Sequence, residues 1–187
     1  MKKIPTLFQR NYDGDRLVRN EVTPGCEWVL AGEGKATRKV DGTCCLVRDG
    51  KLYKRHEVQP GKVPPWAFEP ANFVEEVTGK QQGWLPVGAG PEDKWHREGW
   101  ETILPMFYDK VPDGTYELLG PKIQGNPEHA AVHYLEPHGD QPLFDAPRDF
   151  DGLKDYLRTT DIEGIVWHRE NGDMVKLKKR DFGFKRK

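Results

Sequence analysis

Short hydrophobic runs separated by turn residues dominate the chain and predict mainly β-structure. The runs lie at residues 46–47, 116–119, 130–135 and 165–167. Two tight hairpins are expected at 48–51 and 170–173, since Asp-Gly and Asn-Gly suit the positive φ angles of short turns. Helical patterns are fewer, at 71–77, 92–101 and 152–157, the last with Asp149 or Asp151 as a candidate N-cap. This pattern favours an α+β domain of antiparallel sheets with flanking helices.

The second hairpin places charged residues by simple counting. With the Asn-Gly pair as a two-residue loop, Trp167 faces Lys176 and Ile165 faces Lys178. Side chains alternate between sheet faces, so Glu163 is expected on the same face as these two lysines. An acid and two lysines, about 7 Å apart along a strand, suit phosphate oxygens and a metal ion better than a core. Two lysines on a solvated face are the alternative.

The first hairpin brings an arginine toward the preceding loop. With Asp49-Gly50 as the turn, Val47 faces Leu52 and Cys44 faces Arg55. Arg55 is thereby folded back to within a few residues of Lys39, where it could hold the sugar or phosphate of a nucleotide. An arginine that ends a hairpin in solvent is the alternative.

Lys39 lies two residues before Asp41-Gly42 and is a candidate nucleophile. A free lysine has a pKa of about 10.4 and is protonated at neutral pH, whereas desolvation and cationic neighbours favour the neutral amine. The cationic neighbours of Lys39 would be Lys176, Lys178 and Arg55, together with a divalent metal. These positive charges would also neutralise the charge of a triphosphate. Attack of the amine on an α-phosphorus would give a covalent lysine–nucleotide intermediate. A surface lysine is the alternative.

Composition indicates a soluble, intracellular protein. The chain has 187 residues, of which 36% are hydrophobic and 32% are charged. This length and composition fit one domain over residues 1–187. The segment at about 60–99 is rich in Pro, Gly and Trp and is expected to be a loop-heavy insertion that lies over the sheet. No apolar run approaches the roughly 20 residues that span a bilayer, and no signal peptide is evident. Three cysteines make neither a disulfide framework nor a CxxC pair, so a reducing cytoplasm is expected.

The net charge of −1 conceals a strongly basic end. Residues 176–187 contain seven basic residues and one acid, a charge of +6, so the rest of the chain carries −7. A basic segment on an acidic body indicates contact with a polyanion such as a phosphate chain. A solubilising tail is the alternative.

The candidate residues occur in a characteristic order: Lys39-Val40-Asp41-Gly42, Arg55, Tyr116-Glu117-Leu118-Leu119-Gly120, Glu163-Gly164-Ile165-Val166 and Val175-Lys176-Leu177-Lys178. This series resembles the nucleotidyltransferase motifs of ATP-dependent DNA ligases, RNA ligases and mRNA-capping enzymes. The stretches RKVDGTCC, YELLGPKIQGNPE, PEDKWH and DIEGIVWHRENGDMVKLKKRDFG further resemble a small family of 5′-to-3′ RNA ligases with a vertebrate member and prokaryotic or phage relatives.

The resemblance implies a role for each matching residue. Lys39 would be the adenylated nucleophile, and Lys176 and Lys178 would hold the α-phosphate. Arg55 would contact the ribose or the RNA 5′-phosphate, Glu117 would bind the ribose hydroxyls, and Tyr134 is our choice for stacking on adenine. Glu163 would bind a metal, with Asp41 lending an indirect or water-mediated contact.

The implied activity is ATP-dependent RNA ligation with magnesium or manganese. The enzyme would adenylate itself, pass AMP to a 5′-phosphate RNA end and join that end to a 3′-hydroxyl. A capping-type guanylyltransferase, another lysine-linked adenylyltransferase and a non-catalytic RNA-binding module are the alternatives. The sequence ends nine residues after Lys178, so we expect no OB domain of the kind that DNA ligases and capping enzymes carry.

Other residues are weaker candidates. Four tryptophans of the 60–100 region are possible platforms for single-stranded bases, although core packing is the commoner role: Trp66, Trp84, Trp95 and Trp100. His129 and His133 have zinc-ligand spacing on a helix, but a strand is expected there, so metal binding by this pair is not favoured. Cys44 and Cys45 are expected to pack in a strand.

Overall fold

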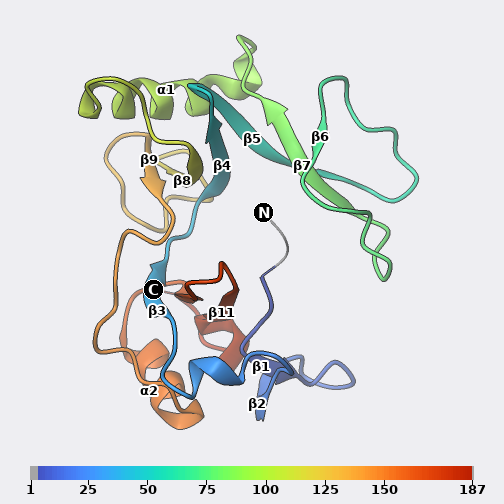
Figure 1. Cartoon of the computed structure of the whole chain (residues 1–187), viewed down its shortest axis with the longest axis vertical. Helices are drawn as coiled ribbons and strands as arrows, with labels where there is room; N and C mark the ends of the chain where they lie inside the picture. The colour runs from blue at the N-terminus through green and yellow to red at the C-terminus, as the bar shows by residue number, and fades with distance from the viewer. Residues whose placement is uncertain (1–3, 187) are drawn as a thin grey trace. The chain divides into compact units, whose positions relative to one another are not determined.

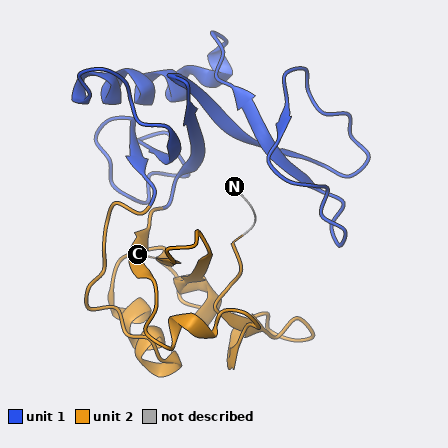
Figure 2. Ribbon diagram, viewed as in Figure 1, with its two compact units in different colours: residues 1–2, 41–138 blue, residues 3–40, 139–187 orange. Residues whose placement is uncertain are grey.

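The computed structural model describes residues 4–186 and has an α+β fold of antiparallel sheets with two α-helices (Figure 1). The α+β expectation is therefore confirmed. The chain divides into two compact units, one formed by residues 41–138 and the other by residues 4–40 and 139–186 (Figure 2). The chain passes between them at Val40–Asp41 and at His138–Gly139. Each unit is described by itself.

The unit 41–138 contains a six-stranded antiparallel sheet in the order β6-β7-β5-β4-β8-β9. Its strands are β4 (Thr43–Arg48), β5 (Lys51–Val58), β6 (Glu69–Pro70), β7 (Gln81–Pro86), β8 (Gly114–Leu119) and β9 (Tyr134–Pro137). Helix α1 (Lys94–Ile103), flanked by the 3-10 turns η2 (Pro91–Asp93) and η3 (Leu104–Met106), contacts β8 and β9. The core between helix and sheet includes Cys45, Val47, Ile103 and Leu118.

The hairpin β4–β5 has the predicted register. Val47 lies opposite Leu52, and both turn residues, Asp49 and Gly50, have positive φ angles of 52° and 68°. These angles are those that an Asp-Gly turn supplies at low cost, so the local sequence sets the pairing of the two strands.

Three expectations for this unit are corrected. Segment 60–99, expected to lie over the sheet, contributes β6 and β7 to the sheet itself, since β7 pairs with β5. No helix forms at 71–77, where Phe73 and Val77 are more than 90% exposed and have no core to bury against. The strand expected at 130–135 begins only at Tyr134, because Asn126 bonds both the N–H and the C=O of Ala130 and closes a turn there.

The other unit contains a two-stranded and a three-stranded sheet. Strands β1 (Phe8–Arg10) and β2 (Val18–Val22) form the first, and the second has the order β11-β10-β3, with β3 (Lys35–Lys39), β10 (Gly164–His168) and β11 (Met174–Lys178). Helix α2 (Phe150–Thr159) begins at Asp149, whose side chain accepts the N–H of Gly152 at 2.8 Å. The N-cap prediction is therefore confirmed. The 3-10 turns η1 (Glu27–Val29) and η4 (Lys179–Phe182) complete the unit.

The register predicted for the second hairpin is wrong by one residue. Val166 lies opposite Lys176 and Gly164 opposite Lys178, whereas Ile165 and Trp167 are fully buried on the opposite face. The cause is a three-residue loop, 170–172, closed by a 2.9 Å hydrogen bond from the N–H of residue 169 to the C=O of residue 173. One extra loop residue moves every side chain of a strand to the other face.

Candidate active site

Lys39 lies at the end of β3, beside the glycine that begins β10. Gly164 pairs with Lys39 on one side and with Lys178 on the other, so the two lysines occupy matching positions on the strands that flank β10. A Cβ at Gly164 would lie 2.3 Å from the carbonyl oxygen of Leu177. Glycine therefore permits the close approach of β10 and β11 at this point.

Glu163 holds both lysines. Its carboxylate forms an ion pair with the Nζ of Lys39 through one oxygen and with the Nζ of Lys178 at 3.2 Å through the other. The carbonyl of Glu163 accepts the N–H of Lys179 at 2.8 Å, which fixes the acid directly before β10. The three side chains are only 12–23% exposed, so the ion pairs are shielded from much of the solvent. The structure thus brings together the acid and two of the lysines expected from the sequence, although Glu163 lies outside the strand.

Lys176 lies on the same face of β11 as Lys178, two residues away, and is the least stabilised cation of the cluster. Its pKa is lowered to about 8, mainly by burial and in addition by the charges of Lys178 and Lys39, whose effect exceeds the opposite effect of the nearby acids Asp181 and Glu163. Burial also lowers the pKa of Lys178, against the opposing effect of Glu163. None of the described residues forms an ion pair with Lys176. An anion beside Lys176 would therefore stabilise its charged form, because none of the described carboxylates forms an ion pair with it.

A basic pocket extends from these lysines across the N-terminal segment. Residues 4–6 run alongside β11, where Lys176 donates its N–H to Pro5 and accepts the N–H of Leu7. Arg10 pairs with Asp181 at 2.5 Å, and Arg180 is exposed. The pocket is lined by residues 4–6, 8–10, 12, 23–24, 176, 178 and 180. Arg10 is a site candidate that the sequence did not reveal, since no motif marks it. Arg180 belongs to the basic end 176–187, for which contact with a polyanion is expected.

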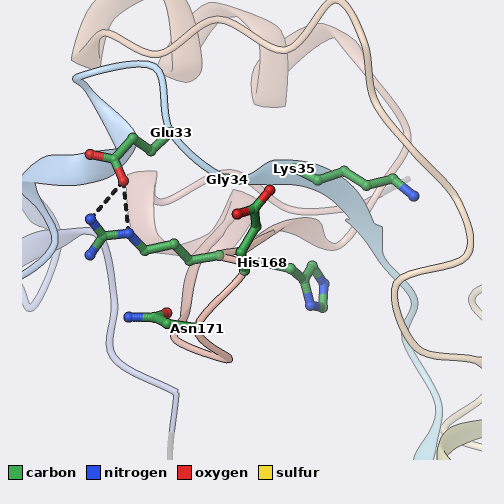
Figure 3. A pocket seen from close by; sticks show the side chains of 7 residues that line it. Glu33, Gly34, Lys35, His168 and Asn171 are labelled. Atoms are coloured by element: carbon green, nitrogen blue, oxygen red, sulfur yellow. Dashed lines mark hydrogen bonds and ion pairs between the residues drawn. The ribbon is translucent and has the colours of Figure 1, made fainter.

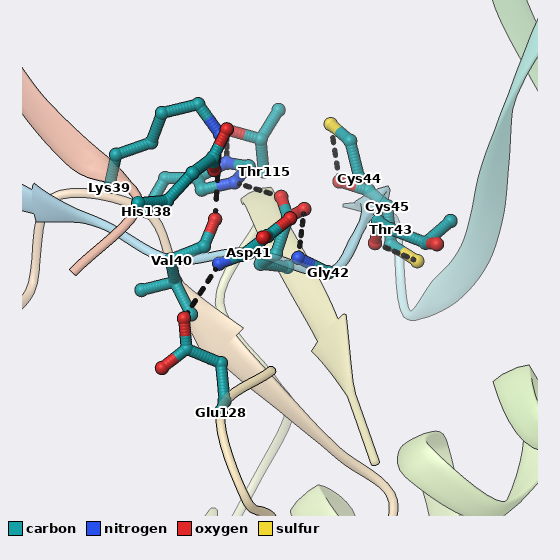
Figure 4. A network of polar contacts seen from close by, with 12 residues as sticks. Lys39, Val40, Asp41, Gly42, Thr43, Cys44, Cys45, Thr115, Glu128 and His138 are labelled. Atoms are coloured by element: carbon teal, nitrogen blue, oxygen red, sulfur yellow. Dashed lines mark hydrogen bonds and ion pairs between the residues drawn. The ribbon is translucent and has the colours of Figure 1, made fainter. Parts of the chain in front are cut away.

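A second cluster of polar residues lies in the unit 41–138, around Glu117 on β8. One carboxylate oxygen of Glu117 accepts the N–H of Gly42 at 3.0 Å, and the other lies 2.7 Å from the Nε2 of His138 (Figure 4). The N–H of Asp41 donates to Glu128 at 2.9 Å. Two carboxylates therefore fix the loop that follows Lys39 in the sequence.

Arg55 is held on β5 of the same unit. Its Nε donates to the side chain of Gln82 at 2.9 Å, and its guanidinium lies 5.8 Å from the centre of the Trp84 ring. The hairpin count that places Cys44 opposite Arg55 agrees with the register of β4 and β5, in which Cys45 lies opposite Lys54.

The remaining expected residue of this unit, Tyr134, begins β9 opposite Leu119 and is half-buried. His138 is a further site residue that was not predicted. Side chains of a strand alternate between the two faces of the sheet, and this alternation could have placed His138 on the same face as Glu136. Glu136 faces Glu117, and His138 follows two residues later. The structure thus places Asp41, Arg55, Glu117 and Tyr134 in one unit and Lys39, Glu163, Lys176 and Lys178 in the other.

The tryptophans of the 60–100 region differ in environment. Trp84 is 5% exposed, Trp95 and Trp100 pack against the core of their unit, and Trp66 is 95% exposed. Trp95 stacks on His133, whose Nδ1 lies 2.8 Å from a carboxylate oxygen of Glu98. A base-stacking role thus stays a prediction for Trp66.

A further pocket lies at the other end of β3 and belongs to neither cluster (Figure 3). Glu33 accepts two hydrogen bonds from Arg169 there, at 2.8 and 2.6 Å. Lys35 pairs with His168 in this region, four residues before Lys39, so the pocket lies roughly 13 Å along the strand from the candidate nucleophile.

Comparisons with known proteins agree with the expected family. A model of the RNA ligase 1 family matches residues 91–186, just over half of the chain. The RNA ligase 1 proteins of Mus musculus, Rattus norvegicus and Danio rerio are 26%, 26% and 23% identical to it, over 79%, 79% and 80% of this chain. The match covers 66% of the Mus musculus protein, so the chain spans just under two thirds of that relative. The chain belongs to the RNA ligase 1 family.

The segment that matches the family model contains some of the candidate residues but not all of them. Glu117, Glu163, Lys176 and Lys178 lie inside the matched segment, whereas Lys39 and Arg55 precede it. No helix among residues 4–186 is both long and apolar enough to cross a membrane.

Proposed function

We propose that this protein is an ATP-dependent RNA ligase that forms a covalent adenylate on Lys39. The observation that carries the proposal is the cluster in which Lys39 meets Glu163 and Lys178, with Lys176 on the same sheet face. Family membership supports RNA as the substrate. The proposal treats the two units as parts of a single nucleotidyltransferase domain.

In the first step the Nζ of Lys39 attacks the α-phosphorus of ATP. A phosphorus–nitrogen bond forms, the bond to the β-phosphate oxygen breaks and pyrophosphate leaves. Lys39 must lose its proton before it attacks. Lys176 and Lys178 stabilise the negative charge that builds on the phosphate oxygens in the transition state.

Glu163 is the residue that fits a divalent metal in this cluster. Magnesium and manganese prefer carboxylate oxygens, and magnesium is commonly held by one or two carboxylates together with water and substrate phosphates. Glu163 offers such a carboxylate next to Lys39. A bound metal would neutralise phosphate charge. Asp41, two residues after Lys39, is proposed as a weaker, water-mediated contributor.

Nucleotide recognition is assigned to residues of the unit 41–138. Glu117 already accepts the N–H of Gly42 and contacts His138, but an ionised carboxylate has about four acceptor positions, so it can still accept hydroxyls of a ribose. Arg55 is proposed to contact the ribose or the RNA 5′-phosphate, and Tyr134 to stack on adenine.

The remaining steps join two RNA ends. The 5′-phosphate of one RNA end attacks the lysine-linked phosphorus, which returns Lys39 to the free amine and gives an RNA capped by AMP. The 3′-hydroxyl of another end then attacks the 5′-phosphate, the new phosphodiester forms and AMP leaves. The exposed Arg180 and the half-buried Arg10 of the basic pocket are proposed to contact RNA phosphates.

The test is self-labelling with α-labelled ATP or GTP and magnesium, analysed on a denaturing gel. Lys39→Ala is compared with Lys35→Ala, an exposed lysine of the same strand four residues earlier. We expect ATP to label the wild type and Lys35→Ala but not Lys39→Ala. Addition of 5′-phosphorylated RNA should remove the label from the protein and release it as AMP while a sealed RNA product forms.

Each other outcome selects a different function. Labelling by GTP alone would indicate a capping-type guanylyltransferase. Labelling by ATP without sealing of any 5′-phosphorylated RNA would indicate another adenylyltransferase. RNA binding without labelling, unchanged in Lys39→Ala, would indicate a non-catalytic binding module and would refute the proposal.

A further inference from the structure

Three side chains with different metal-binding atoms meet beside the sugar-binding residue proposed above. The Sγ of Cys44, a carboxylate oxygen of Glu117 and a ring nitrogen of His138 all lie within 4.8 Å of one another. Cys44 on β4 pairs directly with Glu117 on β8, and His138 directly follows β9, the next strand of the same sheet (Figure 4). All three residues belong to the unit 41–138.

The distances suit one small cation. Zinc binds thiolate sulfur at about 2.3 Å and histidine nitrogen or carboxylate oxygen at about 2.0–2.2 Å, in a tetrahedral arrangement. Two ligand atoms of one tetrahedral zinc ion therefore lie about 3.3–3.7 Å apart. The three atoms lie within 4.8 Å of one another, so side-chain rotations would have to adjust them around a common ion, with a fourth position left open.

Hydrogen bonds can hold the ring of His138 in the same orientation with and without a metal ion. Its Nδ1 lies 3.0 Å from the hydroxyl of Thr115, and its Nε2 faces Glu117 at 2.7 Å. Without a metal, the Thr115 hydroxyl can donate to Nδ1 while Nε2 donates to the carboxylate. With a metal on Nε2, the same hydroxyl accepts from Nδ1, which is the supporting hydrogen bond that zinc-bound histidines usually have.

Cys44 supplies the sulfur ligand of the cluster. It is half-buried on β4, directly opposite Glu117 on β8. A thiophilic cation binds the thiolate and displaces the proton of the thiol.

We propose that Cys44, Glu117 and His138 form a site for a thiophilic divalent cation of the zinc class, and that its occupation inhibits the enzyme. Binding forms one metal–sulfur bond and releases one proton from Cys44. The ion occupies acceptor positions of Glu117 and so competes with the nucleotide sugar. The competition rests on the proposed function, whereas the metal site does not.

Metal binding is measured first, on the full chain without nucleotide and in a non-thiol reductant. Cobalt(II) serves as the spectroscopic probe, because a cobalt–thiolate bond gives a sulfur-to-metal charge-transfer absorption, and zinc affinity follows from competition with a chromogenic chelator. Cys44→Ser and His138→Gln remove one ligand each. Cys45→Ala is the control, since Cys45 is fully buried in the core on the other face of β4.

We expect one ion per chain and the charge-transfer band in the wild type and in Cys45→Ala. Cys44→Ser should lose the band, and both ligand variants should bind zinc at least 10-fold more weakly, with unchanged circular dichroism. A charge-transfer band and zinc affinity in Cys44→Ser equal to those of the wild type, or no band in the wild type, would overturn the site.

Inhibition is measured second, by self-labelling with ATP at saturating magnesium over a range of zinc concentrations. The concentration that halves labelling, relative to each protein's own zinc-free rate, should be at least 10-fold higher for Cys44→Ser and should rise with ATP. Unchanged inhibition in Cys44→Ser would refute the competition. Loss of all labelling in the zinc-free wild type would instead refute the proposed function and leave the cobalt result standing.

Discussion

Replacing Lys176 by methionine should make the protein more stable while it removes activity. Lys176 is half-buried, is affected more strongly by the charges of two lysines than by those of the nearby acids, and lacks an ion-pair partner among the described residues. Methionine keeps the length and the apolar stem of the side chain and deletes the charge. The unit formed by residues 4–40 and 139–186 should therefore be more stable in the Lys176→Met variant, although this variant should bind phosphate more weakly.

The size of this gain follows from the lowered pKa. Lys176 falls from an ordinary pKa of 10.5 to about 8 in the folded protein. At about 1.4 kcal/mol per pH unit, its charged form costs the fold at most about 3 kcal/mol at pH 7. The ammonium is partly exposed and water screens the repulsion, so we expect a gain of about 1–2 kcal/mol.

The pH dependence gives the sign of the effect. Unfolded Lys176 holds its proton more tightly than folded Lys176, so the wild type gains stability as pH rises from about 8 to 10.5. The advantage of Lys176→Met should be complete at pH 7 and fall to a few tenths of a kcal/mol by about pH 10.

The assay is urea unfolding at pH 7 and pH 10, followed by fluorescence and circular dichroism, together with ATP self-labelling at pH 7. Lys154→Met is the control, because Lys154 is an exposed lysine of helix α2. Lys176→Met should raise the urea midpoint at pH 7 and lower labelling at least 10-fold, and Lys154→Met should change neither. A Lys176→Met protein that is less stable at pH 7, or a gain that does not shrink by pH 10, would refute the reasoning.

Three further variants test the two units. Gly164→Ala should cost about 1–3 kcal/mol and reduce self-labelling, because its Cβ would lie 2.3 Å from the carbonyl of Leu177; normal labelling and stability would contradict the close approach. Trp167→Ala, at a fully buried position, should cost about 3–5 kcal/mol in urea unfolding, and a loss below about 1 kcal/mol would contradict the packing. Asp93→Asn breaks a 2.5 Å pair with Lys54 and should cost about 1–3 kcal/mol at pH 7. Burial, the largest single effect, would raise the pKa of Asp93, but Lys54, the N–H of Gly88 and His96 together lower it. The loss should therefore shrink as pH falls below about 4, and a pH-independent loss would contradict the pair.

The sequence alone determined the features that depend on neighbouring residues. The Asp49-Gly50 turn fixed the register of β4 and β5, and Asp149 marked the start of α2. Both depend on backbone conformations and hydrogen bonds within a few residues, which the local sequence specifies. The motifs that follow Lys39 likewise indicated the family, because their residue types and their order along the chain are properties of the sequence itself.

Only the tertiary structure decided which side chains share the sites. A loop of three residues instead of two, at 170–172, placed Trp167 in the core and Val166 beside the lysines, because alternation turns a one-residue error into a change of face. The contacts of Arg10 with Asp181 and of Glu117 with His138 join residues 171 and 21 positions apart. The sequence does not show which segments pair, since the packing of whole strands and segments brings these residues together.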